Sequence, residues 1–237
     1  MVDLFCFDRN ILITYLKYII DLEQAMDLEQ VRREYLKQGL SRSELELDPI
    51  KQLELWLSQA SNVELVDATA MSLSTVDSHG QPSQRVVLLK RLDEKGLVFY
   101  TNLKSRKALD IQANSKVSLL FAWLPLERQV KIQGVAHKMS AMENLAYFAT
   151  RPKDSQLAAW ASRQSQQISS RKFLNQAFEQ MKAKFADGEV PLPDFWGGYL
   201  IKPTQFEFWQ GGGARLHDSF VYTIDNSSVW TINRLAP

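Results

Sequence analysis

Hydrophobic and polar residues alternate along several segments of the chain, and this pattern predicts an antiparallel β structure. In residues 68–76, Met71, Leu73 and Thr75 would share one face, with serines on the other. Turn-forming residues such as Gly80, which is free to adopt a positive φ, separate neighbouring segments. Further strands are expected at 84–90, 97–101, 117–123, 129–137, 198–209, 220–224 and 229–234.

Helical patterns precede and interrupt these strands. Residues 29–37 are charged and helix-favouring, and Asp48-Pro49 supplies an N-cap and a first-turn proline for a helix to about Gln59. Helices are also expected at 105–114 and at 141–187, the latter with a break at Arg151-Pro152. The fold class is therefore mostly β with flanking helices (α+β), a small antiparallel barrel. The chain lacks strand–helix alternation and a Gly-rich fingerprint, which excludes a dinucleotide-binding parallel sheet.

Composition narrows the class of partner. The 237 residues suit one domain, and 28 Lys and Arg against 27 Asp and Glu leave a net charge of +1. This balance gives no support for a nucleic-acid or membrane partner. Cys6 is the single cysteine, so the fold needs no internal disulfide and a cytoplasmic location is expected. The three histidines and the cysteine show no metal-ligand spacing, so no metal is expected.

The first 25 residues need a separate interpretation. Residues 1–20 are apolar but interrupted by charges, and they match neither a membrane span nor a signal peptide. A short docking helix is one alternative. We favour a dispensable extension, because Met26 followed by DLEQVRREYL would make a plausible start. The expected organisation is thus an extension at 1–25 and a single domain at 26–237.

The run Arg85-Val86-Val87-Leu88-Leu89-Lys90 is the first candidate for chemistry. Four apolar residues predict a buried strand, and a cation at each end is costly to bury without an anion. Strand alternation places Arg85 and Lys90 on opposite faces, so functional cations there would serve two different anions. The alternative is two charges at the solvated ends of an ordinary strand.

Two further segments carry groups that bind phosphate. Residues 100–107 place hydroxyls and cations at a predicted helix start, where backbone N–H groups and the helix dipole favour an anion. A capped and solvated helix start explains them equally well. Tyr147, Arg151 and Ser155 recur at intervals of four, and all three donate hydrogen bonds. The alternative for these three is an ordinary helix surface.

The segment 208–218 combines aromatic residues, a glycine run and then Arg215 and His217. In an extended chain the last two would lie on one side and face one ligand. A loop that carries an ordinary surface arginine is the alternative.

Together these segments resemble the pyridoxamine (pyridoxine) 5′-phosphate oxidase family over residues 32–237. The resemblance implies an FMN-binding split β-barrel of Greek-key antiparallel topology, with a C-terminal dimerisation region and FMN at the interface of a homodimer. It implies oxidation of pyridoxamine or pyridoxine 5′-phosphate to pyridoxal 5′-phosphate, with hydride transfer to flavin N5 and reoxidation by O2 to H2O2. The motifs that carry it are RREY (32–35), QRVVLLK (84–90), FYTN (99–102), SRK (105–107), ERQV (127–130), RPKDSQ (151–156), QS (164–165), PLPDFWGG (191–198), EFWQGG (207–212), RLHD (215–218) and RLAP (234–237).

The resemblance also implies roles for individual residues. Arg215 and His217 are the catalytic candidates, placed over the substrate ring, and the residues do not identify either as a base. The residues implied for FMN are Arg85, Val86, Val87, Leu88, Leu89, Lys90, Tyr100, Thr101, Arg106, Lys107, Gln129, Gln164, Ser165, Trp209 and Ser219. The residues implied for the substrate are Arg32, Arg33, Glu34, Tyr35, Lys90, Tyr147, Arg151, Ser155, Arg215 and His217.

Position 219 departs from the family pattern. The chain has Ser219 where the family carries an arginine that contacts the flavin, and this predicts weaker FMN binding. Gly213 and Ala214 make the preceding loop small and flexible. A split-barrel relative that binds FMN or pyridoxal phosphate with weakened or lost oxidase activity is therefore the alternative, and a flavin reductase with another substrate is a third.

Overall fold

The described part of the chain is built around one nine-stranded antiparallel sheet. The computed structural model describes residues 34–35, 39–63, 65, 67–225 and 229–236. Contacts divide the chain into residues 1–35 and 36–237, and the account below concerns the second unit. Most of the helix expected at 29–37, the extension at 1–25 and the candidates Arg32 and Arg33 lie outside the described residues. Glu34 is exposed and Tyr35 half-buried, and neither is in a helix or strand.

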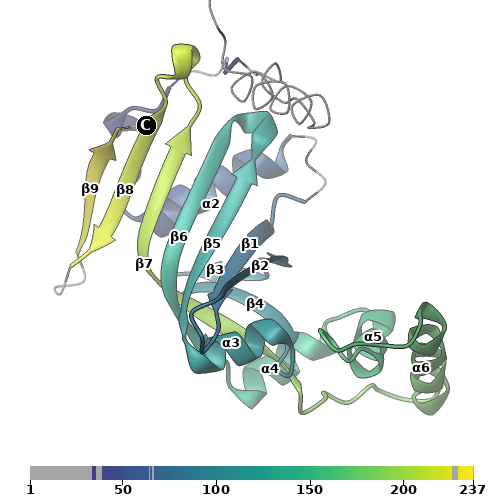
Figure 1. Cartoon of the computed structure of the whole chain (residues 1–237). Coiled ribbons are helices and arrows are strands. Elements are labelled where there is room, and N and C mark those ends of the chain that lie inside the picture. Colours follow the sequence, from purple (N-terminus) through teal and green to yellow (C-terminus); the bar gives the residue numbers. More distant parts are fainter. Residues whose placement is uncertain (1–33, 36–38, 64, 66, 226–228, 237) are drawn as a thin grey trace, which may run out of the picture. The chain divides into compact units, whose positions relative to one another are not determined.

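The strands follow the order β2-β1-β5-β6-β7-β4-β3, and β8 pairs with β7 and β9 (Figure 1). Neighbours that are distant in sequence, β1 with β5 and β4 with β7, give the crossovers expected of a Greek-key barrel. The bounds are β1 Ala70–Val76, β2 Pro82–Leu88, β3 Arg91–Asp93, β4 Gly96–Asn102, β5 Lys116–Trp123, β6 Arg128–Lys138, β7 Trp196–Gln210, β8 Asp218–Ile224 and β9 Trp230–Leu235.

The long strand β7 connects the two ends of the sheet. Its first part, from Trp196 to Ile201, pairs with β4, and its last part, from Gln205 to Gln210, pairs with β8. β6 runs beside it over nearly its whole length, with a register shift at Gln133/Gly134. One strand therefore contributes residues to both ends of the sheet.

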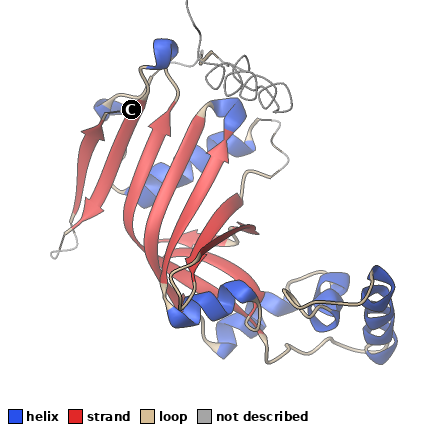
Figure 2. Ribbon diagram, viewed as in Figure 1, coloured by secondary structure: helices blue, strands red, loops and turns tan. Residues whose placement is uncertain are grey.

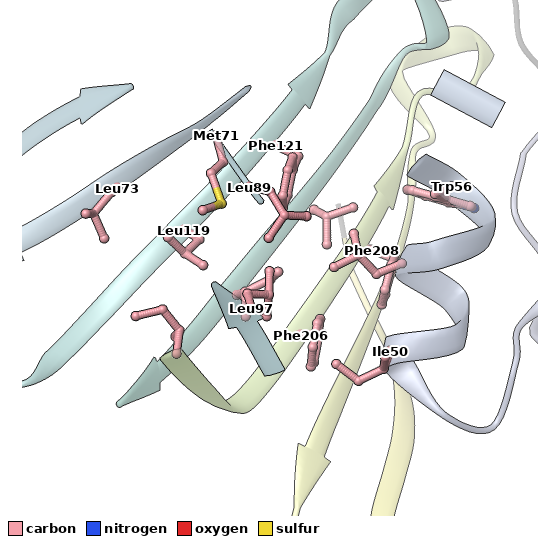
Figure 3. Packing of buried hydrophobic residues seen from close by; sticks show 14 of the residues in the cluster. Ile50, Trp56, Met71, Leu73, Leu89, Leu97, Leu119, Phe121, Phe206 and Phe208 are labelled. Atoms are coloured by element: carbon pink, nitrogen blue, oxygen red, sulfur yellow. The ribbon is translucent and has the colours of Figure 1, made fainter. Parts of the chain in front are cut away.

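Helix α2 (Pro49–Ser61) covers one face of the sheet and closes the core (Figure 3). Its start is the expected one, because the Asp48 side chain accepts a hydrogen bond from the amide of Ile50 at 2.8 Å. Trp56 packs edge-on against Phe208, with ring centroids 5.2 Å apart. Alternate residues of each strand point toward this helix, as the sequence pattern predicted for β1, where Met71, Leu73 and Thr75 are buried.

Helices α3 to α6 gather at one end of the sheet (Figure 2). Their bounds are α3 Arg106–Ala113, α4 Ala141–Ala149, α5 Lys153–Ala161 and α6 Arg171–Lys184, and the 3-10 turns are η1 Arg42–Glu44, η2 Leu124–Leu126 and η3 Gly213–Arg215. The break at Arg151-Pro152 is confirmed, but the expected helix 141–187 has a second break between α5 and α6. The strand expected at 84–90 ends at Leu88, and the short strand β3 was not expected.

Candidate functional site

A groove of about 410 Å³ opens at the helical end of the sheet. We call it the cationic groove, because four of its lining residues, Arg85, Lys90, Lys107 and Arg151, carry positive charge. Its size lies within the range usual for small-molecule sites. The other lining residues are Val86, Val87, Leu88, Tyr100, Thr101, Tyr147, Gln164 and Trp196. Eleven of these twelve were expected to bind cofactor or substrate, and the structure places them around one space.

Strand β2 forms one wall of the groove, and it is an edge strand. The expected alternation is confirmed: burial alternates along β2, with Arg85 and Val87 half-buried and Leu89, just beyond it, in the core. The expectation of a wholly buried strand is wrong, since Val86 is 69% exposed and Leu88 37% exposed. Because β2 has a neighbour on one side only, its second face is left to a ligand or to another chain.

Arg85 is held mainly by neutral oxygens at the inner wall. Its guanidinium donates to the Thr75 hydroxyl at 2.7 Å, the Ser83 hydroxyl at 2.8 Å and the Leu73 carbonyl at 3.2 Å. The nearest carboxylate, that of Asp110, is 3.7 Å away. Burial lowers the pKa of Arg85, but an arginine keeps its charge at any physiological pH. The side chain therefore presents a fixed cation to the groove.

Arg106 lies at the start of α3, beside the groove and not among its lining residues. Its Nε donates to the buried Asp110 carboxylate at 2.8 Å, and its second nitrogen pairs with Asp77 at 2.5 Å. The hydrogen bond to Asp110 raises the pKa of Arg106. Asp110 also accepts from the Thr75 hydroxyl at 2.7 Å, so one buried carboxylate organises this whole wall.

Lys107 is the most buried cation of the groove, at 7% exposure. Its ammonium contacts three neutral oxygens: Gln164 Oε1 at 3.0 Å, Thr101 Oγ1 at 3.2 Å and Ser105 Oγ at 3.4 Å. Desolvation, and then the nearby charge of Arg85, lower the pKa of Lys107 to about 8. A bound anion would remove this electrostatic cost.

Aromatic residues form the opposite wall. The rings of Tyr100 and Tyr147 stack with centroids 3.9 Å apart, and the Trp196 ring lies 5.1 Å from that of Tyr100. Gly198 permits this packing, because a Cβ there would lie 2.8 Å from the Tyr100 ring. Burial raises the pKa of both tyrosines, so their hydroxyls stay protonated and act as donors. The sequence analysis quoted the motif that contains Trp196 but assigned this residue no role.

The second set of expected residues lies on β6, β7, β8 and the turn between the last two. Cross-strand pairing aligns Gln129 with Trp209 and Trp209 with Ser219, so these three form a row on one face of the sheet. The Trp209 ring lies 4.7 Å from the ring of His217. Ser219 is buried and lies 3.2 Å from Glu207, which pairs with Lys131 at 2.7 Å.

The turn that carries Arg215 and His217 has an unusual backbone. Ala214 and Arg215 adopt positive φ angles of 53° and 61°, a region that costs a residue with a Cβ about 1–2 kcal/mol. His217 Nδ1 accepts a hydrogen bond from the Gly212 amide at 3.1 Å. Nδ1 is therefore unprotonated, and the ring carries its proton on Nε2 in the neutral form. The Arg215 side chain is exposed.

The two sets lie at opposite ends of the sheet. Figure 1 shows the β7–β8 connection at the end away from α3 and α4. Trp196 at one end of β7 and Trp209 near the other are separated by a strand path of roughly 40 Å, at about 3.3 Å per residue. A small molecule cannot contact both sets within one chain.

Three expected residues lie outside both sets. The Leu89 side chain lies in the core, at 7% exposure, and only its backbone faces β2. Ser155 is half-buried in α5 and does not line the groove. Ser165 is exposed and has a φ of 69°, next to Gln164, whose side chain reaches Thr101 and Lys107.

No helix in the described part of the chain is both long and apolar enough to cross a membrane.

Family models match most of the chain. The model described as pyridoxamine 5′-phosphate oxidase matches residues 58–185, and the model of the pyridoxine 5′-phosphate oxidase C-terminal dimerisation region matches residues 196–237. The protein named pyridoxine/pyridoxamine 5′-phosphate oxidase from Shewanella sp. (strain MR-4) is 59% identical over 211 residues, 89% of this chain and 99% of that protein. The protein of the same name from Shewanella oneidensis is 58% identical over the same length.

Solved structures share the fold. PhzG from Burkholderia lata 383, crystallised with tetrahydrophenazine-1-carboxylic acid, superposes with a TM-score of 0.80 at 26% identity, over 86% of this chain and 100% of that chain. A pyridoxamine 5′-phosphate oxidase-related, FMN-binding protein from Nostoc punctiforme superposes with a TM-score of 0.67 at 17% identity, over 81% of this chain and 98% of that one. The second likeness concerns the fold alone.

Proposed function

The chain belongs to the pyridoxamine 5′-phosphate oxidase family, and we propose that it oxidises pyridoxamine or pyridoxine 5′-phosphate to pyridoxal 5′-phosphate with FMN. The observation that carries this proposal is the cationic groove, where four cations and two tyrosine hydroxyls surround one space. A cofactor and a substrate that each carry a phosphate need two separate anion sites, and the groove has cations on two walls.

The groove residues fit FMN. Arg85 and Lys107 are buried or half-buried cations whose contacts are mostly neutral oxygens, and a phosphate dianion would supply the missing counter-charge. Arg106 lies beside them, and it shares Asp110 with Arg85. These residues would hold the FMN phosphate, while Tyr100, Thr101 and Gln164 would line the rest of the site. Bound FMN supplies the redox chemistry, as acceptor of a hydride that O2 then removes as H2O2.

Lys90, Tyr147 and Arg151 would hold the substrate phosphate on the other wall. The Arg151 guanidinium has a buried nitrogen, Nη1, with no hydrogen-bond partner among the described residues. A buried donor of this kind costs free energy until an acceptor arrives. With one end of the substrate anchored, the reacting carbon is confined to one position, which is the largest contribution that a protein without a reactive side chain makes. Arg32 to Tyr35 and Ser155 are proposed contacts of the same substrate.

A homodimer completes the site in this proposal. Residues 196–237 match a dimerisation region, and Gln129, Trp209, Arg215, His217 and Ser219 lie too far from the groove of their own chain. In a two-fold dimer each groove receives the second set from the partner. The exposed Val86 and Leu88 on β2 are apolar surface that a ligand and a partner would cover. His217, neutral and protonated on Nε2, would then donate toward the substrate ring, and Arg215 would position it.

One assay tests the function. The purified protein should show a flavin spectrum and form pyridoxal 5′-phosphate from either substrate in an O2-dependent reaction with equimolar H2O2. An FMN-loaded dimer that forms no product would contradict the oxidase proposal. That outcome would favour the second candidate, a binding relative with lost activity, for which the specific observation is Ser219 in place of a cation.

We also propose a single domain at 26–237 with a dispensable extension at 1–25, in a cytoplasmic enzyme. Relatives that align over 99% of their own length match 211 of the 237 residues, which supports an extension. Deletion of residues 1–25 should leave expression and activity unchanged, and loss of either would contradict this part of the proposal.

A further inference from the structure

Trp196 is the one residue of the cationic groove that was not expected to bind cofactor or substrate. It begins β7, is 7% exposed, and lines the groove beside Arg151. Its ring lies nearly parallel to that of Tyr100, at 5.1 Å and 6°, and to that of Tyr147, at 6.2 Å and 9°. Trp196 thus contacts one tyrosine from each of the two proposed subsites.

The Arg151 guanidinium also lies over this ring. Its central carbon is 4.8 Å from the centroid of Trp196 and 5.7 Å from that of Phe148. Within the described residues no carboxylate forms an ion pair with Arg151, and its Nη1 is buried without a hydrogen bond. The aromatic faces are therefore the main contacts that fix the orientation of this cation.

The chemistry of the contact suits a phosphate site. A carboxylate would hold Arg151 firmly, as Asp110 holds Arg106, but its charge would oppose an incoming phosphate dianion. An indole ring attracts the guanidinium through its quadrupole and leaves the positive charge uncompensated. Tryptophan is also the aromatic residue with the strongest attraction for cations.

We propose that Trp196 is a positioning residue that orients Arg151 and Tyr147 for the substrate phosphate. The inference rests on the proposed function, because it assumes that these two side chains bind that phosphate. Trp196 itself touches no reacting atom in this role. It should therefore affect the binding of substrate more than the rate of the bound complex.

A purely structural role is the competing explanation, since Trp196 also packs in a hydrophobic cluster with Phe148, Leu157 and Val190. Leu157 offers a matched control, because it is 1% exposed in that cluster but does not belong to the aromatic stack. Leu157→Ala should lower thermal stability and leave the KM for pyridoxamine 5′-phosphate unchanged.

The test compares Trp196→Leu and Trp196→Phe with wild type and with Leu157→Ala. Trp196→Leu should raise both the KM for pyridoxamine 5′-phosphate and the inhibition constant of inorganic phosphate by roughly five- to thirtyfold, the equivalent of a lost desolvated cation–π contact. The kcat and the dissociation constant of FMN should change little. Trp196→Phe, which keeps a ring, should recover most of the affinity, and it carries the test if Trp196→Leu does not fold.

The outcomes separate the inference from the proposed function. A wild-type protein that turns over no substrate would remove both. An active wild type whose KM and phosphate inhibition are unchanged in the Trp196 variants would overturn the inference alone. A Leu157→Ala variant whose KM rises as much as that of Trp196→Leu would also overturn it, because the effect would then come from the packing of the cluster.

Discussion

The Nε of Arg106 donates a 2.8 Å hydrogen bond to the carboxylate of Asp110, a side chain that is 2% exposed. The same carboxylate lies 3.7 Å from Arg85 and accepts from Thr75. One buried anion therefore fixes two of the three cations proposed for the FMN phosphate. It also compensates part of their charge, so its removal has two opposite effects.

Asp110→Asn should destabilise the FMN-free protein by about 1.5–3 kcal/mol, the usual contribution of a hydrogen bond to a charged group. The destabilisation should be smaller with FMN bound, because the phosphate then supplies the missing counter-charge. By linkage, the increase in Tm on adding FMN should be larger in the variant than in wild type. Thermal unfolding with and without FMN measures both, and Asp187→Asn, an exposed carboxylate, is the control. An equal FMN-induced increase in all three proteins would contradict the proposed proximity of the phosphate to Asp110.

FMN binding should weaken above pH 8, because the lowered pKa of Lys107 leaves this side chain cationic below about pH 8 and neutral above it. A phosphate ester is already a dianion in this range, so Lys107 is the group that titrates. The dissociation constant of FMN should then rise by up to about tenfold per pH unit, since binding takes up the proton that Lys107 has lost. Fluorescence titrations of FMN between pH 7 and 9.5 measure this slope.

The control variants locate the titrating group. Lys107→Met should bind FMN weakly with no pH dependence over this range. Lys104→Met, which removes an exposed lysine from the same segment, should keep the wild-type slope. A slope that persists in Lys107→Met would assign the titration to another residue.

The sequence predicted the strands and most of the groove because both depend on local patterns. Alternation in β1 and β2 determines which residues face inward, and the motifs placed the groove residues in the right segments. The sequence could not reveal that Arg215 and His217 lie far from Lys90 in the same chain, because this depends on the path of β7 through the sheet. Trp196 was missed for a related reason: its role depends on a stack of rings from three elements, and a single aromatic residue at a strand start predicts only core packing. The exposure of Val86 and Leu88 follows from the edge position of β2, which the local sequence does not encode.

Ser219→Arg should tighten FMN binding. The buried Ser219 hydroxyl lies in the row with Gln129 and Trp209, and an arginine there would restore a cation that the family carries. One charge-assisted hydrogen bond is worth roughly 1.5–3 kcal/mol, or about ten- to a hundredfold in the dissociation constant of FMN. The nearby Glu207, already paired with Lys131, would orient the new guanidinium.

A matched control separates a specific contact from added charge. Val221 lies opposite Glu207 on the same face of β8, so Val221→Arg adds the same charge two residues away. It should tighten FMN binding much less. An unchanged dissociation constant in Ser219→Arg would reject the reasoning, and equal tightening in both variants would reduce it to nonspecific attraction.

Mixed dimers should recover activity that neither parent variant shows. Arg151→Ala removes a residue of the groove, and Arg215→Ala removes a residue of the distant set, so each homodimer has a defect in both sites. In the heterodimer one site carries both substitutions and the other carries neither, because a two-fold interface exchanges the second set between chains. Random assembly from equal amounts should give about a quarter of the wild-type activity, since half of the dimers then hold one intact site of two. Refolding the variants separately and then mixing them without exchange is the control, and it should give none. If heterodimers stay as inactive as both parents, Arg151 and Arg215 act within one chain, and the proposed completion of the groove by the partner is wrong.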